Sequence, residues 1–232
     1  MTVEPRPPAL SLERVSKRYA RGAREVEALS DVTLSVRAGE SVAVTGPSGS
    51  GKSTLLSILG CLDKPTRGRY ALDGEDVSAM DDPTLSRVRN RRIGFVFQSF
   101  HLIPQLTVVE NVETPLLYSP VPVAQWRERA LTCLRKVSLA HRSDHRPAEL
   151  SGGEAQRAAI ARALVCDPGV LLADEPTGNL DSATGDEIAG VLDALHREGR
   201  TLVVVTHNEA LARRARRVVR LRDGRVEADE PA

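Results

Sequence analysis

Residues 46–53 read Gly-Pro-Ser-Gly-Ser-Gly-Lys-Ser, and they decide the fold class of this chain. They fit the pattern G-x-x-x-x-G-K-[ST], in which glycines let backbone N–H groups turn towards phosphate oxygens and the lysine neutralises phosphate charge. The pattern needs a strand before it and a helix after it. Residues 40–45 read as a strand, and residues 53–62 have apolar side chains at helical spacing. The sequence therefore predicts a loop that binds the phosphates of a nucleoside triphosphate.

Two carboxylates follow a second apolar strand, residues 170–173. Open α/β sheets bind their ligands at the carboxyl ends of the strands, which is where Asp174 and Glu175 lie. We expect Asp174 to hold Mg²⁺ through water and Glu175 to act as the general base for the attacking water. Alone, an Asp-Glu pair after a strand is equally compatible with two solvated acids. Together with residues 46–53, the catalytic interpretation is favoured.

Two further strands end on candidate polar groups. His207 follows the apolar residues 202–206, and its imidazole is a candidate to orient the attacking water and the γ-phosphate. Gln98 follows residues 93–97, and its amide is a candidate to complete the Mg²⁺ shell. A structural histidine and a surface glutamine are the alternatives, and only the other motifs argue against them.

The remaining pattern predicts a parallel-sheet α/β core interrupted by helices. Further short strands are expected at residues 10–15, 32–36 and 218–221, and Asp-Gly turns at residues 73–74 and 223–224 indicate hairpins. Helices are expected between about residues 108 and 163, most strongly over 125–137 and 154–164, and again over 183–198.

Composition excludes several classes of protein. The chain has 32 Lys and Arg against 31 Asp and Glu, so bulk charge gives no reason to expect a nucleic-acid partner. No stretch reaches the roughly 20 apolar residues that span a bilayer, and residues 1–9 lack the apolar core of a secretory signal. We therefore expect a soluble cytoplasmic protein.

Arginine runs and cysteines carry weaker signals. The runs within residues 87–92 and 213–222 are interpreted as solvated helix faces, with anionic lipid head groups as the alternative for the second run. Cys61, Cys133 and Cys166 are widely spaced, which is typical of buried thiols in a reducing compartment.

Residues 150–154 read Leu-Ser-Gly-Gly-Glu and have no role in the chain's own nucleotide site. Gly152 and Gly153 would open the N-terminus of the helix at 154–164, which supplies N–H groups and a favourable dipole for an anion. Ser151 is placed to cap that helix and to donate to phosphate. All these motifs, in this order, resemble the nucleotide-binding subunit of an ATP-binding cassette (ABC) transporter over about residues 10–227.

The resemblance implies a P-loop ABC ATPase over residues 1–232, with a RecA-like parallel-sheet core, an antiparallel β subdomain and an inserted helical subdomain at about 99–165. Two copies would enclose two MgATP, with residues 150–154 of one copy capping the γ-phosphate held by the other. Tyr19 would stack on adenine, and Asp181 would contact the second copy. Glu154 stands where the family more often has glutamine, which leaves a sugar contact by this residue in doubt.

The implied site residues fall into three groups. Nucleotide contacts are Tyr19, Gly46, Ser48, Gly49, Ser50, Gly51, Lys52, Ser53, Thr54, Gln98, Ser151, Gly152, Gly153 and Asp181. The Mg²⁺ ligands are Ser53, Gln98 and Asp174, and the catalytic groups are Lys52, Glu175 and His207.

A narrower resemblance, to the MacB/LolD group, rests on residues 58–66, 94–98, 110–113 and 176–182. This group includes macrolide and peptide exporters, lipoprotein-releasing transporters and the FtsE cell-division subunit. It implies a peripheral protein at the cytoplasmic face of the inner membrane, driving a separate permease of the MacB/LolC/FtsX type, with periplasmic adaptors as further partners.

Residues 100–118 are the candidate groove for that permease, and ordinary subdomain core is an equal alternative. An FtsE-like regulatory ATPase, which controls an extracytoplasmic partner without transport, is the second functional hypothesis. A soluble ABC ATPase acting on DNA or ribosomes is a third, and near-neutral charge disfavours it.

Overall fold

The computed structural model describes residues 7–22 and 24–232. One compact unit holds the described residues up to Leu85 together with Val205–Ala232, and the second is Ser86–Val204. The two units are described in turn.

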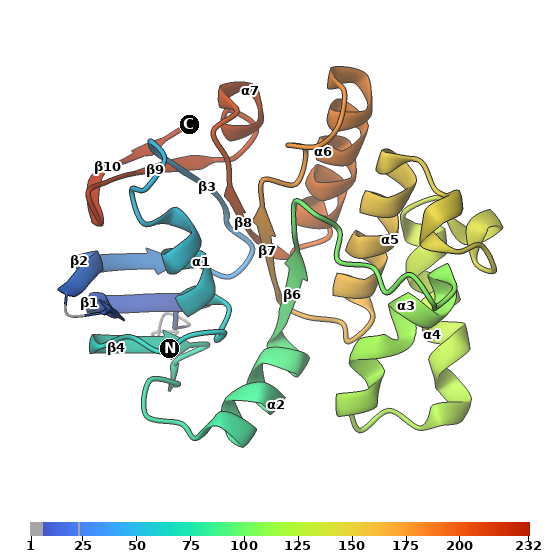
Figure 1. Cartoon of the computed structure of the whole chain (residues 1–232), viewed down its shortest axis with the longest axis horizontal. Coiled ribbons are helices and arrows are strands. Elements are labelled where there is room, and N and C mark those ends of the chain that lie inside the picture. Colours follow the sequence, from blue (N-terminus) through green and yellow to red (C-terminus); the bar gives the residue numbers. More distant parts are fainter. Residues whose placement is uncertain (1–6, 23) are drawn as a thin grey trace, which may run out of the picture. The chain divides into compact units, whose positions relative to one another are not determined.

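The first unit contains an antiparallel sheet with strand order β2-β1-β4-β5 (Figure 1). Its strands are β1 (Leu10–Arg21), β2 (Arg24–Val36), β4 (Arg67–Leu72) and β5 (Glu75–Asp76). The expected strands at 10–15 and 32–36 are present but longer than predicted, because their extensions, residues 16–21 and 24–31, are mostly polar and lack an apolar run. β1 pairs with β4 only up to Ser16, so the rest of β1 pairs with β2 alone as a two-stranded hairpin.

The first unit also contains the strand that leads into the glycine-rich loop. This further part of the first unit has the strands β3 (Ser41–Thr45), β9 (Arg217–Arg222) and β10 (Arg225–Pro231). It also has the helices α1 (Lys52–Leu59) and α7 (Glu209–Ala212). β9 is parallel to β3 and antiparallel to β10. Both predicted features, the strand before the loop and the helix after it, are confirmed.

The second unit contains the strands that carry the acidic motif. Strand order is β8-β7-β6, formed by β8 (Thr201–Val205), β7 (Val170–Asp174) and β6 (Ile93–Val96). β6 and β7 are parallel, as predicted for the core. α2 (Asp82–Arg92) leads into β6, and α6 (Ser182–Arg197) follows β7 in the chain.

A helical segment lies between β6 and β7 in the chain. It consists of α3 (Val108–Glu113), η1 (Thr114–Tyr118), η2 (Val123–Gln125), α4 (Trp126–Lys136), η3 (Ala140–Arg142), η4 (Pro147–Glu149) and α5 (Gly152–Leu164). Asn111 is fully buried in α3 and binds the preceding loop through both ends of its amide. Such satisfied buried polar groups fix one packing arrangement.

The second arginine run does not form a helix face, which corrects the prediction. Arg217, Arg220 and Arg222 lie on β9. The Arg217 guanidinium bonds to Glu40 at 3.0 Å and to both carboxylate oxygens of Asp229. Part of the positive charge of this run is therefore neutralised within the first unit.

The predicted burial of the cysteines holds for two of the three. Cys61 and Cys133 are buried and Cys166 is half-buried, and none of them forms a disulfide within the described residues. Burial raises the pKa of the Cys133 thiol to about 11. Within the described ranges, no helix has both the length and the apolar character that a bilayer-spanning helix needs.

Candidate functional site

The glycine-rich loop connects the end of β3 to the start of α1. Gly46 has φ 145°, and a Cβ there would lie 2.1 Å from the carbonyl oxygen of Leu221. Gly51 is the N-cap of α1 with φ 101°, and a Cβ there would lie 2.5 Å from the carbonyl oxygen of Ala28. Only glycine fits at either end of the loop, so the residues between them are held in a tight turn over the helix N-terminus.

The polar side chains of this loop suit a phosphate ligand. Lys52 Nζ donates to the carbonyl oxygens of Gly46 and Pro47, each at 2.9 Å, which holds the ammonium group over the loop. Ser50 Oγ is buried and makes no hydrogen bond to any part of the chain that the structure describes. The exposed residues Ser48 and Ser53 flank it. An ammonium group, an unsatisfied hydroxyl and a helix N-terminus together fit a triphosphate.

Tyr19 lies beside the first turn of α1, on the two-stranded part of the β1–β2 hairpin. Its hydroxyl donates to Asp63 Oδ2 at 2.8 Å, and its ring is 40% exposed. Burial raises the pKa of Tyr19, the Asp63 carboxylate raises it further, and a side-chain hydrogen bond with Thr54 acts in the opposite direction. The structure thus brings Tyr19 together with Thr54, two of the predicted nucleotide contacts.

His207 is exposed just after the buried end of β8. It lines a cavity of about 600 Å³ whose wall includes Thr45, Gly46 and Arg220. His207 and the first glycine of the loop therefore line the same cavity of the first unit, and a ligand shared between them stays a prediction.

The acidic motif lies where β7 ends. Asp174 is the last residue of the strand, and both Asp174 and Glu175 are half-buried. Glu175 has φ 44°, a left-handed conformation that is uncommon for a non-glycine residue and concentrated at functional sites. Its carbonyl oxygen accepts a hydrogen bond from the Gly178 N–H at 3.0 Å.

Gln156, a residue to which the sequence assigned no role, supports the turn after Glu175. It is fully buried on α5, and its Nε2 donates to the carbonyl oxygen of Pro176 at 2.8 Å. The local sequence around Gln156 did not indicate this contact, because its partner is a backbone group 20 residues further along the chain.

Gln98 is held by a second unassigned residue, Asn179. Gln98 Nε2 donates to Asn179 Oδ1 at 3.1 Å, and Asn179 Nδ2 donates back to the Gln98 carbonyl oxygen at 3.0 Å. A Cβ on Gly178 would lie 2.8 Å from Gln98 Nε2, so the chain between Glu175 and Asn179 packs directly against this amide. Gln98 and the turn after β7 are therefore brought together as predicted.

A capping box closes the N-terminus of α5. Ser151 is its N-cap, and the Ser151 Oγ accepts from the Glu154 N–H at 3.2 Å while Glu154 Oε2 accepts from the Ser151 N–H at 2.9 Å. Glu154 also pairs with Arg142 at 2.9 Å. The pKa of Glu154 is lowered by the Ser151 N–H, against a smaller effect of burial, and further by Arg142. Glutamate at this position thus completes a capping box, with Gly152 starting the helix beside it.

Asp181 caps α6. Its Oδ1 accepts from the Thr184 N–H at 3.0 Å and its Oδ2 from the Thr184 hydroxyl at 2.7 Å, and these bonds lower the pKa of the Asp181 carboxyl. The residue is exposed. Its structural role within the chain is that of an N-cap, and its predicted contact with a second copy stays a prediction.

Comparison with known proteins identifies the family. Residues 29–178 match the family described as ABC transporter. The chain belongs to the ABC transporter family. This ABC ATPase is 54% identical over 95% of its length to an uncharacterized ABC transporter ATP-binding protein of Thermotoga maritima, and the match covers 94% of that protein. It is 49% identical over 95% of its length to the uncharacterized ABC transporter ATP-binding protein YvrO of Bacillus subtilis, of which 96% is covered.

Longer relatives share the same segment. The ABC ATPase is 50% identical over 96% of its length to the macrolide export ATP-binding/permease protein MacB of Brucella melitensis. The match spans only 34% of that MacB protein.

Solved structures confirm the fold. A dimeric structure of the ATP-binding cassette MJ0796, in a post-hydrolysis state bound to ADP and Pi, is 46% identical with a TM-score of 0.88. The match covers 96% of this chain and 98% of the cassette. The predicted α/β fold of an ABC ATPase is therefore correct, and the chain is an ATPase.

Proposed function

We propose that this chain is the ATPase subunit of a MacB/LolD-type transporter, in which two copies close around two MgATP and drive a membrane permease. The observation that carries the proposal is the capped N-terminus of α5, where Ser151 and Gly152 are exposed and can bind an anion. In sequence, this helix end is about 100 residues from the chain's own glycine-rich loop. The dimeric MJ0796 structure supports two copies, and the MacB relatives support a permease partner.

Each residue has a role in this proposal. The loop that starts at Gly46, together with Lys52, binds the phosphates of ATP. Ser53, Gln98 and Asp174 carry the oxygen ligands that Mg²⁺ prefers and would hold the ion, which would neutralise phosphate charge. Glu175 takes a proton from the attacking water, and His207 orients that water. Tyr19 stacks on the base.

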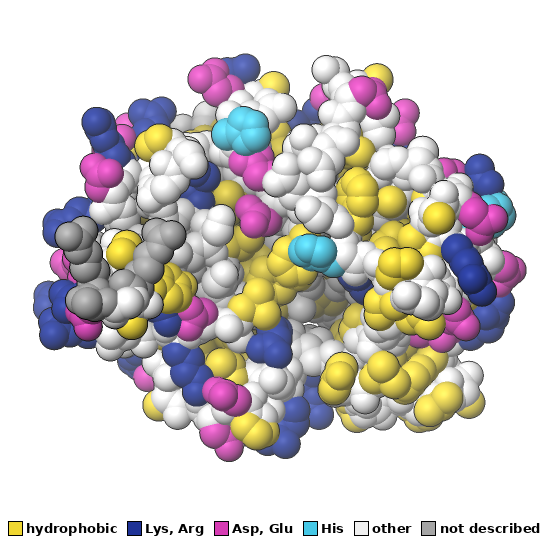
Figure 2. Space-filling model, in the orientation of Figure 1, with side chains coloured by type: hydrophobic (Ala, Val, Ile, Leu, Met, Phe, Trp, Pro, Cys, Tyr) yellow, Lys and Arg dark blue, Asp and Glu magenta, His cyan; other side chains and the backbone are white. Residues whose placement is uncertain are grey.

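The permease proposal rests on exposed apolar side chains in the helical segment. Leu117 is 62% exposed, Tyr118 78% and Val123 71%, and they lie on η1 and η2. Figure 2 shows apolar side chains gathered on this face of the second unit. Exposed apolar groups in one small region mark an interaction site. We propose that they receive a helix of a permease carried on a separate chain, which would place the protein peripherally at the cytoplasmic face of the membrane.

Mixing two inactive variants tests the two-copy site. Lys52→Ala removes the ammonium of the loop, and Gly152→Asp puts a carboxylate at the α5 N-terminus, where it favours the helix but repels phosphate. Each variant alone is expected to lack ATPase activity. An equimolar mixture is expected to regain up to about one quarter of wild-type activity, because half of the dimers are mixed and each has one intact site.

The matched control is an equimolar mixture of the Lys52→Ala variant and the Glu175→Gln variant. Both changes lie in the half-site that one copy supplies, so no mixed dimer has an intact site and activity stays absent. If the mixture of Lys52→Ala and Gly152→Asp is as inactive as each variant alone, that result would contradict the two-copy arrangement.

A charge in the apolar region tests the permease contact. We expect Tyr118→Asp to lower the amount of integral membrane protein that co-purifies with tagged protein from membranes by at least about 10-fold, because an apolar interface excludes an unpaired carboxylate. Val26→Asp is the control, since Val26 is 47% exposed on the β1–β2 hairpin of the first unit. Equal loss with both variants, or no loss with Tyr118→Asp, would refute this contact surface.

A further inference from the structure

The Asp63 carboxylate, just after α1, accepts hydrogen bonds from three donors. Lys17 Nζ and the Lys64 N–H donate to its Oδ1 at 2.5 and 2.8 Å, and the Tyr19 hydroxyl donates to its Oδ2 at 2.8 Å. Lys17 Nζ also donates to the Lys64 carbonyl oxygen at 2.8 Å. One carboxylate therefore ties two side chains of β1 to the loop that follows the phosphate-binding helix.

The same contacts fix the ring of Tyr19. The Lys17 ammonium lies 4.9 Å from the ring centroid, within the range of a cation–π contact. The hydroxyl end is bound to Asp63 and also shares a side-chain hydrogen bond with Thr54 in the first turn of α1. The ring is thus anchored at its polar end while 40% of the residue stays exposed.

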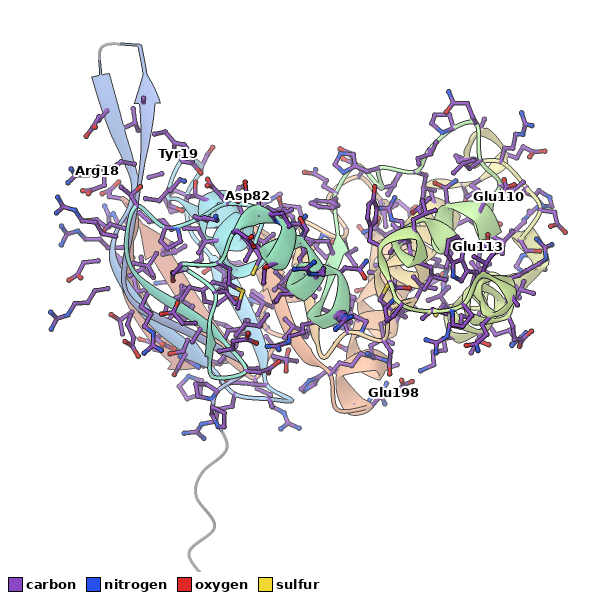
Figure 3. The ribbon with its side chains drawn as sticks, turned by 90° about the horizontal axis from the view of Figure 1, so that it is seen from below. Arg18, Tyr19, Asp82, Glu110, Glu113 and Glu198 are labelled. Atoms are coloured by element: carbon purple, nitrogen blue, oxygen red, sulfur yellow. The ribbon has the colours of Figure 1, made fainter. Side chains whose placement is uncertain are left out.

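This part of the hairpin needs such an anchor. β1 pairs with β4 only up to Ser16, and its residues from Lys17 to Arg21 pair with β2. A two-stranded hairpin by itself is marginally stable in water. Figure 3 shows the hairpin extending beyond the rest of its sheet, with Tyr19 near its base. Side-chain bonds to α1 and the loop after it therefore decide where the ring lies.

The carboxylate at the centre of this cluster is ionised at neutral pH. Burial raises the pKa of Asp63, but the hydrogen bonds from Lys17, Tyr19 and the Lys64 N–H outweigh burial and lower it. The Lys17 side chain is only 12% exposed, so it depends on Asp63 for charge compensation. Loss of the Asp63 charge would weaken the hold on both Lys17 and Tyr19.

We propose that Asp63 is a positioning residue that holds Tyr19 in place for the nucleotide base. The proposal rests on the proposed function, in which Tyr19 stacks on the base of ATP. The Asp63 side chain bonds to Lys17, Tyr19 and Lys64, which lie outside residues 46–53, so its charge is expected to govern affinity for the base and not for the triphosphate.

The experiment compares two ligands, MgATP and inorganic tripolyphosphate with Mg²⁺, by isothermal titration calorimetry. Asp63→Asn keeps the shape of the side chain and removes its charge. It is expected to raise the Kd for ATP about 10-fold, the scale of one base–aromatic stack, and to leave the Kd for tripolyphosphate unchanged. Tyr19→Phe keeps the ring and removes the hydroxyl, and we expect it to raise the Kd for ATP in the same selective way.

Glu27→Gln is the matched control. Glu27 accepts from Arg18 Nε at 3.0 Å on the same hairpin, whereas the Tyr19 hydroxyl bonds to Asp63 and Thr54. Arg18 and Tyr19 are neighbours on β1 and point to opposite sides of the strand (Figure 3). The control is expected to change neither Kd.

The outcomes separate this proposal from the proposed function. Equal weakening of both ligands, or an unchanged Kd for ATP in both variants, overturns the role of Asp63 while leaving the ATPase proposal intact. A wild-type protein that binds ATP no better than tripolyphosphate overturns base stacking itself, and the role of Asp63 with it. If Asp63→Asn does not fold, Tyr19→Phe alone decides, because its only change is the hydroxyl that Asp63 holds.

Discussion

Replacing Glu175 by glutamine is expected to lower kcat for ATP hydrolysis by at least about 100-fold, the scale of a general base, and to leave ATP affinity unchanged. Glutamine has the same size as glutamate, but its amide cannot take the proton of the attacking water. The backbone supports the substitution, since the left-handed conformation at residue 175 and the Gly178 hydrogen bond do not involve the side chain. Steady-state kinetics and equilibrium ATP binding measure the two quantities.

The same variant is expected to accumulate an ATP-bound dimer, visible by size-exclusion chromatography with light scattering. Glu187→Gln is the control, because Glu187 is an exposed carboxylate of α6 that pairs with Arg157 and lies outside the proposed site. A Glu175→Gln protein that hydrolyses ATP at the wild-type rate would show that another group acts as the base. A variant that stays monomeric at every ATP concentration would remove support for the two-copy site.

Asn111→Ala is expected to lower the free energy of unfolding by about 3 kcal/mol, since it removes four hydrogen bonds made by a fully buried side chain. The Asn111 side chain accepts from the Ile103 N–H at 2.6 Å. Its Nδ2 donates to the carbonyl oxygens of Ile103, Leu106 and Thr107 at 2.9 to 3.2 Å. Alanine leaves all of these groups without the amide, and urea unfolding followed by circular dichroism measures the loss.

Asn90→Ala is the graded control for this prediction. Asn90 is half-buried, and its Nδ2 donates to the Pro115 carbonyl oxygen at 2.8 Å. Its replacement is expected to cost about 1 kcal/mol. If both variants lower the free energy of unfolding equally, the hydrogen bonds of Asn111 do not stabilise the protein more than the single bond of Asn90 does.

Local sequence predicted the elements that contain their own signal. The apolar run of residues 170–173 predicts β7, and the carboxylates after it are therefore placed at a strand end. The glycine pattern at 46–53 predicts a loop between a strand and a helix, since few other residues allow the backbone conformations found at Gly46 and Gly51.

Sequence did not predict the contacts that hold these groups in place. Gln98 and Asn179 exchange hydrogen bonds although 81 residues separate them, and Tyr19 meets Asp63 across 44 residues. Such pairs depend on how strands and loops come together in three dimensions. The strand at Arg217 was also misjudged, because an arginine run fits a solvated helix as well as a strand whose arginines pair with carboxylates elsewhere in the chain.

The hydrogen bond from Gln156 to the Pro176 carbonyl oxygen has a consequence for how the two sites of a dimer hydrolyse ATP. Gln156 lies on α5, four residues after Gly152 starts the helix, and Pro176 directly follows Glu175. In the proposed dimer, α5 reaches the nucleotide held by the neighbouring copy, so any shift of α5 on nucleotide release displaces the turn that carries this copy's own base. The rate at one reaction centre of a dimer is then expected to depend on the state of the other centre, and ATP turnover is expected to rise with ATP concentration more steeply than for separate sites.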